Sequence, residues 1–384
     1  MRTRPSILSW IRDCTKPIRR TTIHQLLLLV LFGYLVFRWT RSQYVVDSAN
    51  DIHKAILTGD TPKTILIYDT LQNSYEHWMM WWKLKKDQRC FEREKNLTYR
   101  CRVIFGNESV SDADLVVFSW GLWDRVASSP VPAKRDGQVW ALVTREAPLL
   151  RSDVALPVDW IVTYESDSDV EVPYGQIAER KEALKDSIRF PSKRRLAAAL
   201  ISHCNASSKR DELIRDLKNE NLTIHVYGKC GIREIPGKFI RGYNYLSRKY
   251  KFLLSFENAI CKHYVTEKFY QALQFPWIPV VLGGANYSSI APPKSYVDVM
   301  DFSSVRNLAE YLRYLDGNDT AYCEYFSWKS DYVVEFETNR GCKLCKRLHE
   351  SGNTRVVDLR DFSKERRCFF PDSVERLFSW HRFS

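Results

Sequence analysis

The 384-residue sequence lacks any recognisable nucleic-acid-binding module, although its formal net charge of +12 would suit an anionic partner. Its basic residues are spread through the chain, so nucleic acid is not an expected partner. Disorder is excluded as well, because 45% hydrophobic and 13% aromatic residues supply enough apolar surface for a core. The length suits two domains of ordinary size. An anionic membrane face or a phosphorylated substrate remains as the partner that the charge favours.

A cleavage site of small residues is also missing after the apolar run at 21–39. That run has about 19 residues, just enough for a helix rising ~1.5 Å per residue to cross a thin bilayer. Six basic residues precede it, whereas only Arg38 and Arg41 stand at its end or close behind, which keeps the N-terminus in the cytosol. A cleaved signal peptide is the alternative, but bulky Phe37 and Trp39 stand where cleavage needs small residues. We therefore predict a cytosolic tail at 1–20, an uncleaved signal anchor and a lumenal body.

Sequons and cysteines also place the body in the secretory pathway. Of ten cysteines only Cys14 precedes the anchor, so nine lie where disulfides can form. Nine is odd, which leaves at least one free or joined to another chain and offers a route to an oligomer. Six candidate N-glycosylation sequons follow the anchor, at Asn96, Asn107, Asn205, Asn221, Asn286 and Asn318.

Short β-rich apolar runs alternate with polar or helical stretches along the body, which favours an α/β fold. Four runs occupy the first half, at 64–68, 115–118, 139–143 and 160–164, and four the second, at 196–201, 223–227, 252–256 and 278–282. We predict two Rossmann-like domains facing a cleft. The boundaries expected are a stem at 40–62, an N-terminal acceptor domain at 63–178, a charged linker at 179–195, a C-terminal donor domain at 196–350 and an extension at 351–384.

The densest chemical pattern follows the run that ends at Phe256. Glu257 and Asn258 come at the carboxyl end of this predicted strand, where ligands of open α/β sheets bind. Thr266 can cap a helix whose first backbone N–H groups, with the charge of Lys268, would suit a diphosphate. Glu267 could accept hydrogen bonds from ribose hydroxyls. The same letters also fit a helix cap with a solvated ion pair, and spacing alone does not decide between the two.

The stretch 250–258, with Tyr264-Val265-Thr266-Glu267-Lys268 and Pro279-Val280-Val281-Leu282-Gly283, resembles the donor-binding signature of the α1,3-fucosyltransferases, glycosyltransferase family ten. Similarity extends over roughly 63–347. The resemblance implies a GT-B fold and a Golgi type II membrane enzyme that uses GDP-fucose. It implies inverting transfer to a glycan hydroxyl, expected to be O3 of GlcNAc in an N-glycan. A protein hydroxyl acceptor, or a non-catalytic lumenal glycan-binding protein on the same scaffold, stays as an alternative.

Carried over residue by residue, the resemblance makes Glu146 the general base that takes the acceptor proton. Ala147 replaces the serine usual in that motif. Arg210 matches an arginine that holds the diphosphate, although the usual asparagine is missing from the preceding Ser202-His203-Cys204 and Lys209 could compete for the role. The residues that the resemblance assigns to donor binding are Arg210, Glu257, Asn258, Tyr264, Glu267 and Lys268. His263 stands in place of the family's aspartate.

We expect no required metal. No Asp-x-Asp follows a strand in the donor half, and 167–169, Asp-Ser-Asp, fits a solvated acidic turn. Arg210 and Lys268 can neutralise departing GDP without a cation, and the resemblance implies the same, with manganese at most stimulatory.

Four of the cysteines admit two interpretations. The pair in Cys342-Lys343-Leu344-Cys345 could form half of a zinc site, but a second pair at matching spacing is lacking. Disulfides with Cys90 and Cys101 are the interpretation we favour in an oxidising lumen. The resemblance likewise ties the N-terminal half to a C-terminal Cys-x-x-Cys.

Overall fold

A computed structural model describes residues 62–68, 87–92, 97–107, 109–119, 133–147, 158–182, 195–234, 237, 240–336, 339–350, 357 and 368–380. All of them belong to the compact unit Pro62–Ser384. None of the helices described there has the length and apolar character that a bilayer crossing requires. The predicted tail and anchor, residues 40–61 of the predicted stem, and Asn96 lie outside the described residues.

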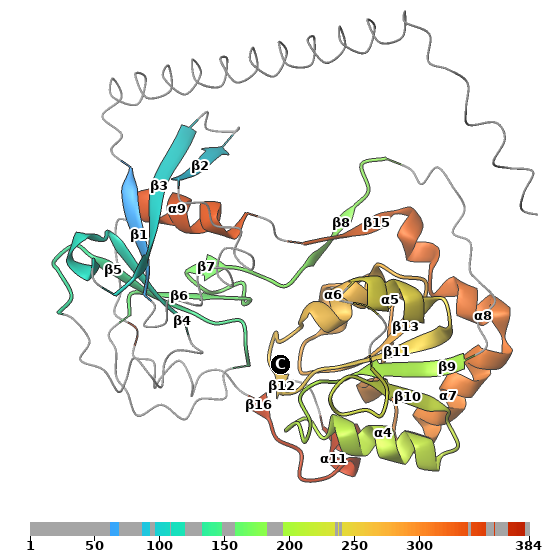
Figure 1. Ribbon diagram of the computed structural model, residues 1–384. Helices are drawn as coiled ribbons and strands as arrows, with labels where there is room; N and C mark the ends of the chain where they lie inside the picture. Colours follow the sequence, from blue (N-terminus) through green and yellow to red (C-terminus); the bar gives the residue numbers. More distant parts are fainter. Residues whose placement is uncertain are drawn as a thin grey trace, which may run out of the picture. The chain divides into compact units, whose positions relative to one another are not determined.

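The first half is built on a seven-stranded sheet in the order β2-β3-β1-β4-β5-β6-β7 (Figure 1). Neighbouring strands run parallel, except that β2 is antiparallel to β3. Every side chain of β5 and β6 is buried, as expected for parallel strands covered on both faces. The strands are β1 (Lys63–Tyr68), β2 (Asp87–Glu92), β3 (Leu97–Gly106), β4 (Leu115–Ser119), β5 (Val139–Val143), β6 (Trp160–Thr163) and β7 (Val170–Glu171), with the short helix η3 (Val110–Asp112) before β4.

Helix α9 (Arg340–Glu350) packs on this first sheet, although it follows the second sheet in the chain. Its Leu344 and Leu348 are fully buried in one core cluster with side chains of β1, β3 and β4. Two disulfides, Cys90–Cys342 and Cys101–Cys345, join α9 to β2 and β3. The predicted donor domain, 196–350, therefore ends in a helix that completes the core of the other half.

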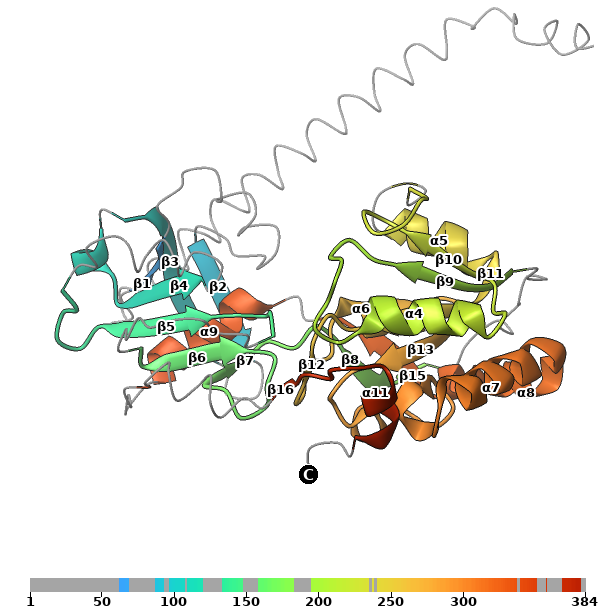
Figure 2. The same cartoon turned by 90° about the horizontal axis from the view of Figure 1, so that it is seen from below.

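The second half is built on a five-stranded parallel sheet in the order β10-β9-β11-β13-β14. Helices α4, α7 and α11 pack in one core cluster with one face of the sheet, and α5 and α6 pack on the other (Figures 1 and 2). The elements are β9 (Arg195–Leu200), α4 (Arg210–Asn219), β10 (Ile224–Tyr227), α5 (Ile240–Ser247), β11 (Tyr250–Phe256), α6 (Glu267–Leu273), β13 (Ile278–Leu282), β14 (Val297–Asp298), α7 (Val305–Gly317) and α11 (Glu375–Ser379).

The order of these strands contains a switch point. From β9 the chain passes to β10 on one side and then returns to β11 on the other side. Connections that diverge in this way leave a crevice outside the carboxyl ends of the two strands, which is where open α/β sheets bind ligands. A site is therefore expected beyond β9 and β11.

Smaller elements complete the second half. The two-stranded pairings are β12 with β16 and β8 with β15, both antiparallel, and Cys261–Cys368 joins the first pair. Leu377 of α11 is fully buried in the main core, so residues 368–380 of the predicted extension belong to this half. The remaining elements are β8 (Gln176–Glu179), β12 (Ile260–Cys261), η5 (Tyr287–Ser289), η6 (Val299–Asp301), α8 (Asp319–Glu324), η7 (Ser327–Ser330), β15 (Tyr332–Glu335) and β16 (Cys368–Phe369).

Candidate active site

Strand β11 ends in a fully buried carboxylate, Glu257. Its Oε1 accepts hydrogen bonds from the backbone N–H of Thr266 at 2.8 Å and from the Thr266 hydroxyl at 2.9 Å. Its Oε2 lies 3.3 Å from the ammonium nitrogen of Lys268. Burial raises the pKa of this carboxyl, while the Lys268 charge and the Thr266 hydrogen bonds oppose that shift. The Glu257 carboxylate therefore fixes the first turn of α6 from behind.

Lys268 stands between this buried carboxylate and the solvent. Its side chain is 25% exposed, and the ammonium also bonds the Thr266 hydroxyl at 2.9 Å and lies 3.4 Å from Glu267. Burial lowers the pKa of Lys268, but the carboxylates of Glu257 and Glu267 outweigh it, so the pKa lies above its ordinary value. Lys268 is consequently a fixed positive charge at neutral pH.

Arg210, the first residue of α4, is only 2% exposed. Its guanidinium donates to the carbonyl oxygen of Phe256 at 3.0 Å and to that of His203 at 2.6 Å. Among the described residues its Nε–H has no hydrogen-bond acceptor and the guanidinium forms no ion pair. Burial lowers the Arg210 pKa from its very high ordinary value. The side chain thus holds a buried positive charge beside an unused donor, which suits an anionic ligand.

The loop between β9 and α4 is bonded to the end of β11. The Ser208 hydroxyl donates to the Glu257 carbonyl at 2.6 Å, and the Ser207 hydroxyl donates to the Asn258 carbonyl at 3.2 Å. A disulfide, Cys204–Cys230, joins the same loop to the turn after β10. The segment 203–205, where the sequence departs from the family pattern, therefore belongs to a loop anchored by a disulfide. The His203 carbonyl in this loop accepts a hydrogen bond from Arg210.

An exposed carboxylate, Glu146, comes to this region from the loop after β5 of the first sheet. The hydroxyl of Tyr264 lies 3.4 Å from Glu146 Oε2 and 3.2 Å from Asn258 Oδ1, within hydrogen-bonding distance of both. Tyr264 is 1% exposed, and burial raises its pKa, so it stays a neutral phenol. It links the carboxylate from one half to the strand end of the other.

One cavity of about 960 Å³ collects most of these side chains. It lies where the switch point predicts a site, beyond β9 and β11. Its lining consists of Glu146, Tyr174, Leu200, Ser202, His203, Arg210, Gly237, Tyr243, Asn258, Tyr264, Thr266, Glu267, Lys268 and Gln271.

Three residues singled out in the sequence do not line this cavity. Glu257 does not line it and acts through Thr266 and Lys268. Lys209 does not line it either, because its ammonium pairs with Glu212 at 2.9 Å. His263 adopts a left-handed backbone at φ 60°, and its Nδ1 lies 3.9 Å from Glu165 and outside the cavity.

Sequence reasoning missed three polar side chains in the lining. Tyr243 and Gln271 come from α5 and α6, and no motif marks them. Tyr174 lies in the Val-Pro-Tyr-Gly segment used for the family resemblance, without a role attached. Its hydroxyl donates to the Arg145 carbonyl, and the Arg145 guanidinium lies 3.7 Å from the centre of its ring. The proximity of a tyrosine to Arg145-Glu146 is a tertiary feature that linear spacing does not encode.

Neither sulfur of the Cys-x-x-Cys motif is available to a zinc ion, because Cys342 and Cys345 each form a disulfide. The sulfur of Cys345 lies close to Cys101 and His349, but both cysteines are consumed in one disulfide. His349 Nε2 is 2.9 Å from the Arg100 carbonyl. Four disulfides occur among the described residues, and Cys323 is the one free, exposed cysteine there, in line with the odd count.

The acidic triplet expected as a solvated turn lies between β6 and β7. Asp169 accepts a hydrogen bond from the backbone N–H of Ile161 at 2.8 Å, so it closes the turn as well as meeting water. Five predicted sequons fall within the described residues. Asn107, Asn205, Asn221 and Asn286 are exposed, whereas Asn318 is half-buried and caps α8 by accepting from Ala321 N–H.

Comparison with known proteins identifies this two-sheet architecture. Two family models match the chain. The model of the N-terminal fucosyltransferase region matches residues 60–175, and the model of the C-terminal region of glycosyltransferase family 10 (fucosyltransferase) matches residues 190–363.

A crystal structure of an α1,3-fucosyltransferase with GDP-fucose is similar at a TM-score of 0.50 and 19% identity, covering 77% of this chain and 93% of that one. A second, with GDP, gives a TM-score of 0.51 at 18% identity, covering 76% and 90%. The fold is thus the α/β GT-B fold of those enzymes.

Relatives by sequence agree. Alpha-(1,3)-fucosyltransferase C of Drosophila melanogaster is 32% identical over 359 residues, which covers 85% of this chain and 84% of the relative. Glycoprotein 3-alpha-L-fucosyltransferase A of the same fly is 30% identical, covering 81% and 62%. The human 4-galactosyl-N-acetylglucosaminide 3-alpha-L-fucosyltransferase 9 is 32% identical, covering 58% and 62%. The chain therefore belongs to glycosyltransferase family 10, the α1,3-fucosyltransferases.

Proposed function

We propose that the protein transfers fucose from GDP-fucose to O3 of a GlcNAc residue in a glycan, with N-glycans as the favoured class, and inverts the fucose carbon. The single observation that carries this proposal is the cavity that contains Arg210 and Lys268 together with the facing carboxylate of Glu146. Two relatives support the acceptor. The human one is named for transfer to position 3 of an N-acetylglucosaminide and the fly one for transfer to glycoproteins.

In this proposal the cationic side of the cavity binds the nucleotide diphosphate. Lys268 supplies a fixed charge, and the unused Nε–H of Arg210 supplies a buried donor. Asn258 and Glu267, which line the same wall, would contact the donor's polar groups, with Glu267 available to ribose hydroxyls. Glu257 holds Lys268 in place without touching the donor. Charges fixed in this way stabilise the negative charge that develops on departing GDP.

The acceptor side depends on Glu146. The acceptor oxygen forms a bond to the anomeric carbon of fucose while the bond from that carbon to the phosphate oxygen breaks. The bonding pair leaves with GDP, and the hydroxyl proton passes to the Glu146 carboxylate. Tyr264, held neutral by burial, lies 3.4 Å from that carboxylate and orients it.

The reaction so described requires no metal, because Arg210 and Lys268 carry the neutralising charge. We therefore propose transfer that persists in a chelator, with manganese acting at most as a stimulant. We also propose a Golgi location with the catalytic body in the lumen, supported by the predicted anchor, the exposed sequons and the four disulfides.

The test uses the lumenal body, radiolabelled GDP-fucose and acceptors that end in GlcNAc, assayed with and without EDTA. We expect label in an α1,3 linkage in both conditions. Glu146→Gln should lower kcat by about a hundredfold or more with unchanged GDP affinity, since only the proton acceptor is removed. The matched control is Glu310→Gln, an exposed glutamate on α7 outside the cavity, which should retain full activity. Full activity of Glu146→Gln would exclude this residue as the base, and GDP binding without transfer to any glycan would favour a binding protein.

A further inference from the structure

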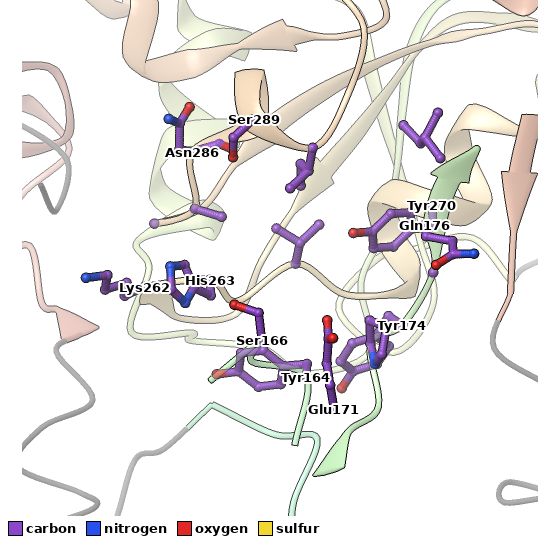
Figure 3. A pocket seen from close by; sticks show the side chains of 17 residues that line it. Tyr164, Ser166, Glu171, Tyr174, Gln176, Lys262, His263, Tyr270, Asn286 and Ser289 are labelled. Atoms are coloured by element: carbon purple, nitrogen blue, oxygen red, sulfur yellow. The ribbon is translucent and has the colours of Figure 1, made fainter. Parts of the chain in front are cut away.

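A second cavity of about 650 Å³ lies beside the first. It opens beyond the carboxyl end of β13, the strand that pairs with β11. Its walls come from the 164–177 segment, from the turn after β12 and from residues 284–290 (Figure 3). The volume falls in the range of sites that bind small organic ligands, about 300–1,000 Å³.

The floor of this cavity is rigid. Tyr164, Tyr174 and Tyr270 are each at least 93% buried, and Tyr164 also contacts Tyr264 of the active site, with ring centres 5.3 Å apart. Gly175 gives Tyr270 its position, because a Cβ at that residue would lie 2.7 Å from the Tyr270 ring. The tyrosines are therefore packed in place before any ligand arrives.

Two polar groups on the floor and wall have no protein partner. Tyr270 is 7% exposed, and its hydroxyl makes no hydrogen bond within the described residues. The Glu171 carboxylate forms no ion pair or hydrogen bond there either. Figure 3 shows both groups, with the Ser166 hydroxyl, directed into the hollow. Burial and the Glu171 charge raise the pKa of Tyr270 to about 12, so it remains a hydrogen-bond donor at neutral pH.

This chemistry selects a type of ligand. The exposed Glu171 carboxylate offers hydrogen-bond acceptors and the Tyr270 phenol offers a donor, a combination that a ligand with many hydroxyl or amide groups can satisfy. The exposed Lys262 also lines the cavity, so its charges are mixed and favour a ligand without net charge, and a hydrocarbon would leave the Tyr270 hydroxyl unpaired. The amides of Gln176 and Asn286 extend the polar rim.

The position of the cavity relates it to the active site. Tyr174 lines both cavities, and its backbone neighbours form the wall of the second. A branched or extended glycan whose accepting hydroxyl faces Glu146 would place its next sugars near this shared tyrosine.

We propose that the second cavity binds the part of a neutral acceptor oligosaccharide that is remote from the accepting hydroxyl, through hydrogen bonds to Glu171 and Tyr270. The inference rests on the proposed function, since it takes the glycan as the acceptor. It makes the second cavity a determinant of specificity for extended acceptors over minimal ones.

The experiment measures binding directly, by calorimetry in the absence of GDP-fucose, with a mannose-core N-glycan oligosaccharide and with N,N′-diacetylchitobiose. The variants are Glu171→Ala and Tyr270→Phe, with Glu310→Ala as the matched control, all in a Ser288→Ala background so that no glycan at Asn286 covers the rim. We expect the extended oligosaccharide to bind about tenfold tighter than chitobiose, as one or two hydrogen bonds to a charged group allow. Either cavity variant should remove this advantage, and the control should keep it.

GDP affinity, measured on the same samples, reports whether each variant is folded. Equal affinity for the two saccharides in the unsubstituted cavity, or an advantage that survives Glu171→Ala and Tyr270→Phe, would overturn the proposal. Its failure is distinct from failure of the proposed function. Loss of fucose transfer in a protein that still shows the Glu171-dependent advantage would reject the reaction and retain the subsite.

Discussion

At the scale of single residues, the pair Glu257–Lys268 would connect stability to the proposed donor binding. Lys268→Met would leave a fully buried carboxylate facing only Thr266, so we expect the free energy of unfolding to fall by about 3 kcal/mol. GDP affinity should fall at least about tenfold, because the phosphate contact proposed for Lys268 would be lost. Urea denaturation and GDP calorimetry measure the two effects.

The double variant Glu257→Gln, Lys268→Met separates the effect on stability from the effect on GDP affinity. Neutralising the buried acid should restore most of the stability without restoring GDP affinity. If the double variant bound GDP as tightly as the unsubstituted protein, Lys268 would serve only to pair with Glu257.

Lys329 provides a pH-dependent prediction. Burial, with a smaller effect of Arg180, lowers its pKa to about 7, while its ammonium bonds the carbonyl oxygens of Leu273 and Phe275. The unfolded chain therefore binds more protons than the folded one between pH 7 and the ordinary lysine value, so this group makes stability rise with pH across that window. Lys329→Met should remove the trend. Relative to the unsubstituted protein, the variant should gain on the order of 2 kcal/mol between pH 9 and pH 6. Urea melts at these pH values measure it, and a constant difference would show that Lys329 titrates normally.

At the scale of elements, the loop before α4 determines where Arg210 lies. Removing Cys204–Cys230 with two serines would release the His203 carbonyl that accepts from the Arg210 guanidinium. We expect the KM for GDP-fucose to rise about fivefold with little change in kcat, because the change affects the proposed donor contact of Arg210 and not the proposed base. Steady-state kinetics at saturating acceptor would measure this.

The matched control is removal of Cys261–Cys368, a bridge outside the cavity. It should lower stability and leave the KM for GDP-fucose unchanged. Equal increases in both double variants would mean that the KM reports general loosening of the fold.

Elements with long apolar runs were the most predictable part of the fold. The strand expected at 278–282 coincides with β13 (Ile278–Leu282), and the helix expected from Glu267 is α6. The sequence did not predict which side chains of a motif face the cavity and which are buried behind it. Glu257 and Lys268 stand eleven positions apart in one motif, yet only the lysine faces the cavity. Sequence spacing predicts the strand end but not the packing that buries one of two neighbouring charges.

At the scale of the whole molecule, α9 and its two disulfides join chain segments that the predicted boundaries had separated. Hydrophobic periodicity could indicate a helix at 340–350 but not which sheet it covers, because both sheets offer apolar faces. Removing Cys90–Cys342 with two serines should lower the free energy of unfolding by about 2–5 kcal/mol. Thermal unfolding in the absence of reductant measures the loss.

Cys323→Ser is the control for that loss, since this cysteine is free and exposed. It should leave the melting temperature unchanged and remove any disulfide-linked dimer seen on non-reducing gels. A stability loss as large as that of the double variant would show that Cys323 has a structural partner.

The two disulfides to α9 can form only late in synthesis of the chain. The paired cysteines are 252 and 244 residues apart, so at about 5–20 residues per second the earlier thiols wait roughly 10–50 s before their partners emerge from the ribosome. During that interval Cys90 and Cys101 stay open to oxidoreductases and to each other. A nascent chain that stops short of α9 would lack both partner cysteines and could form neither of these bridges.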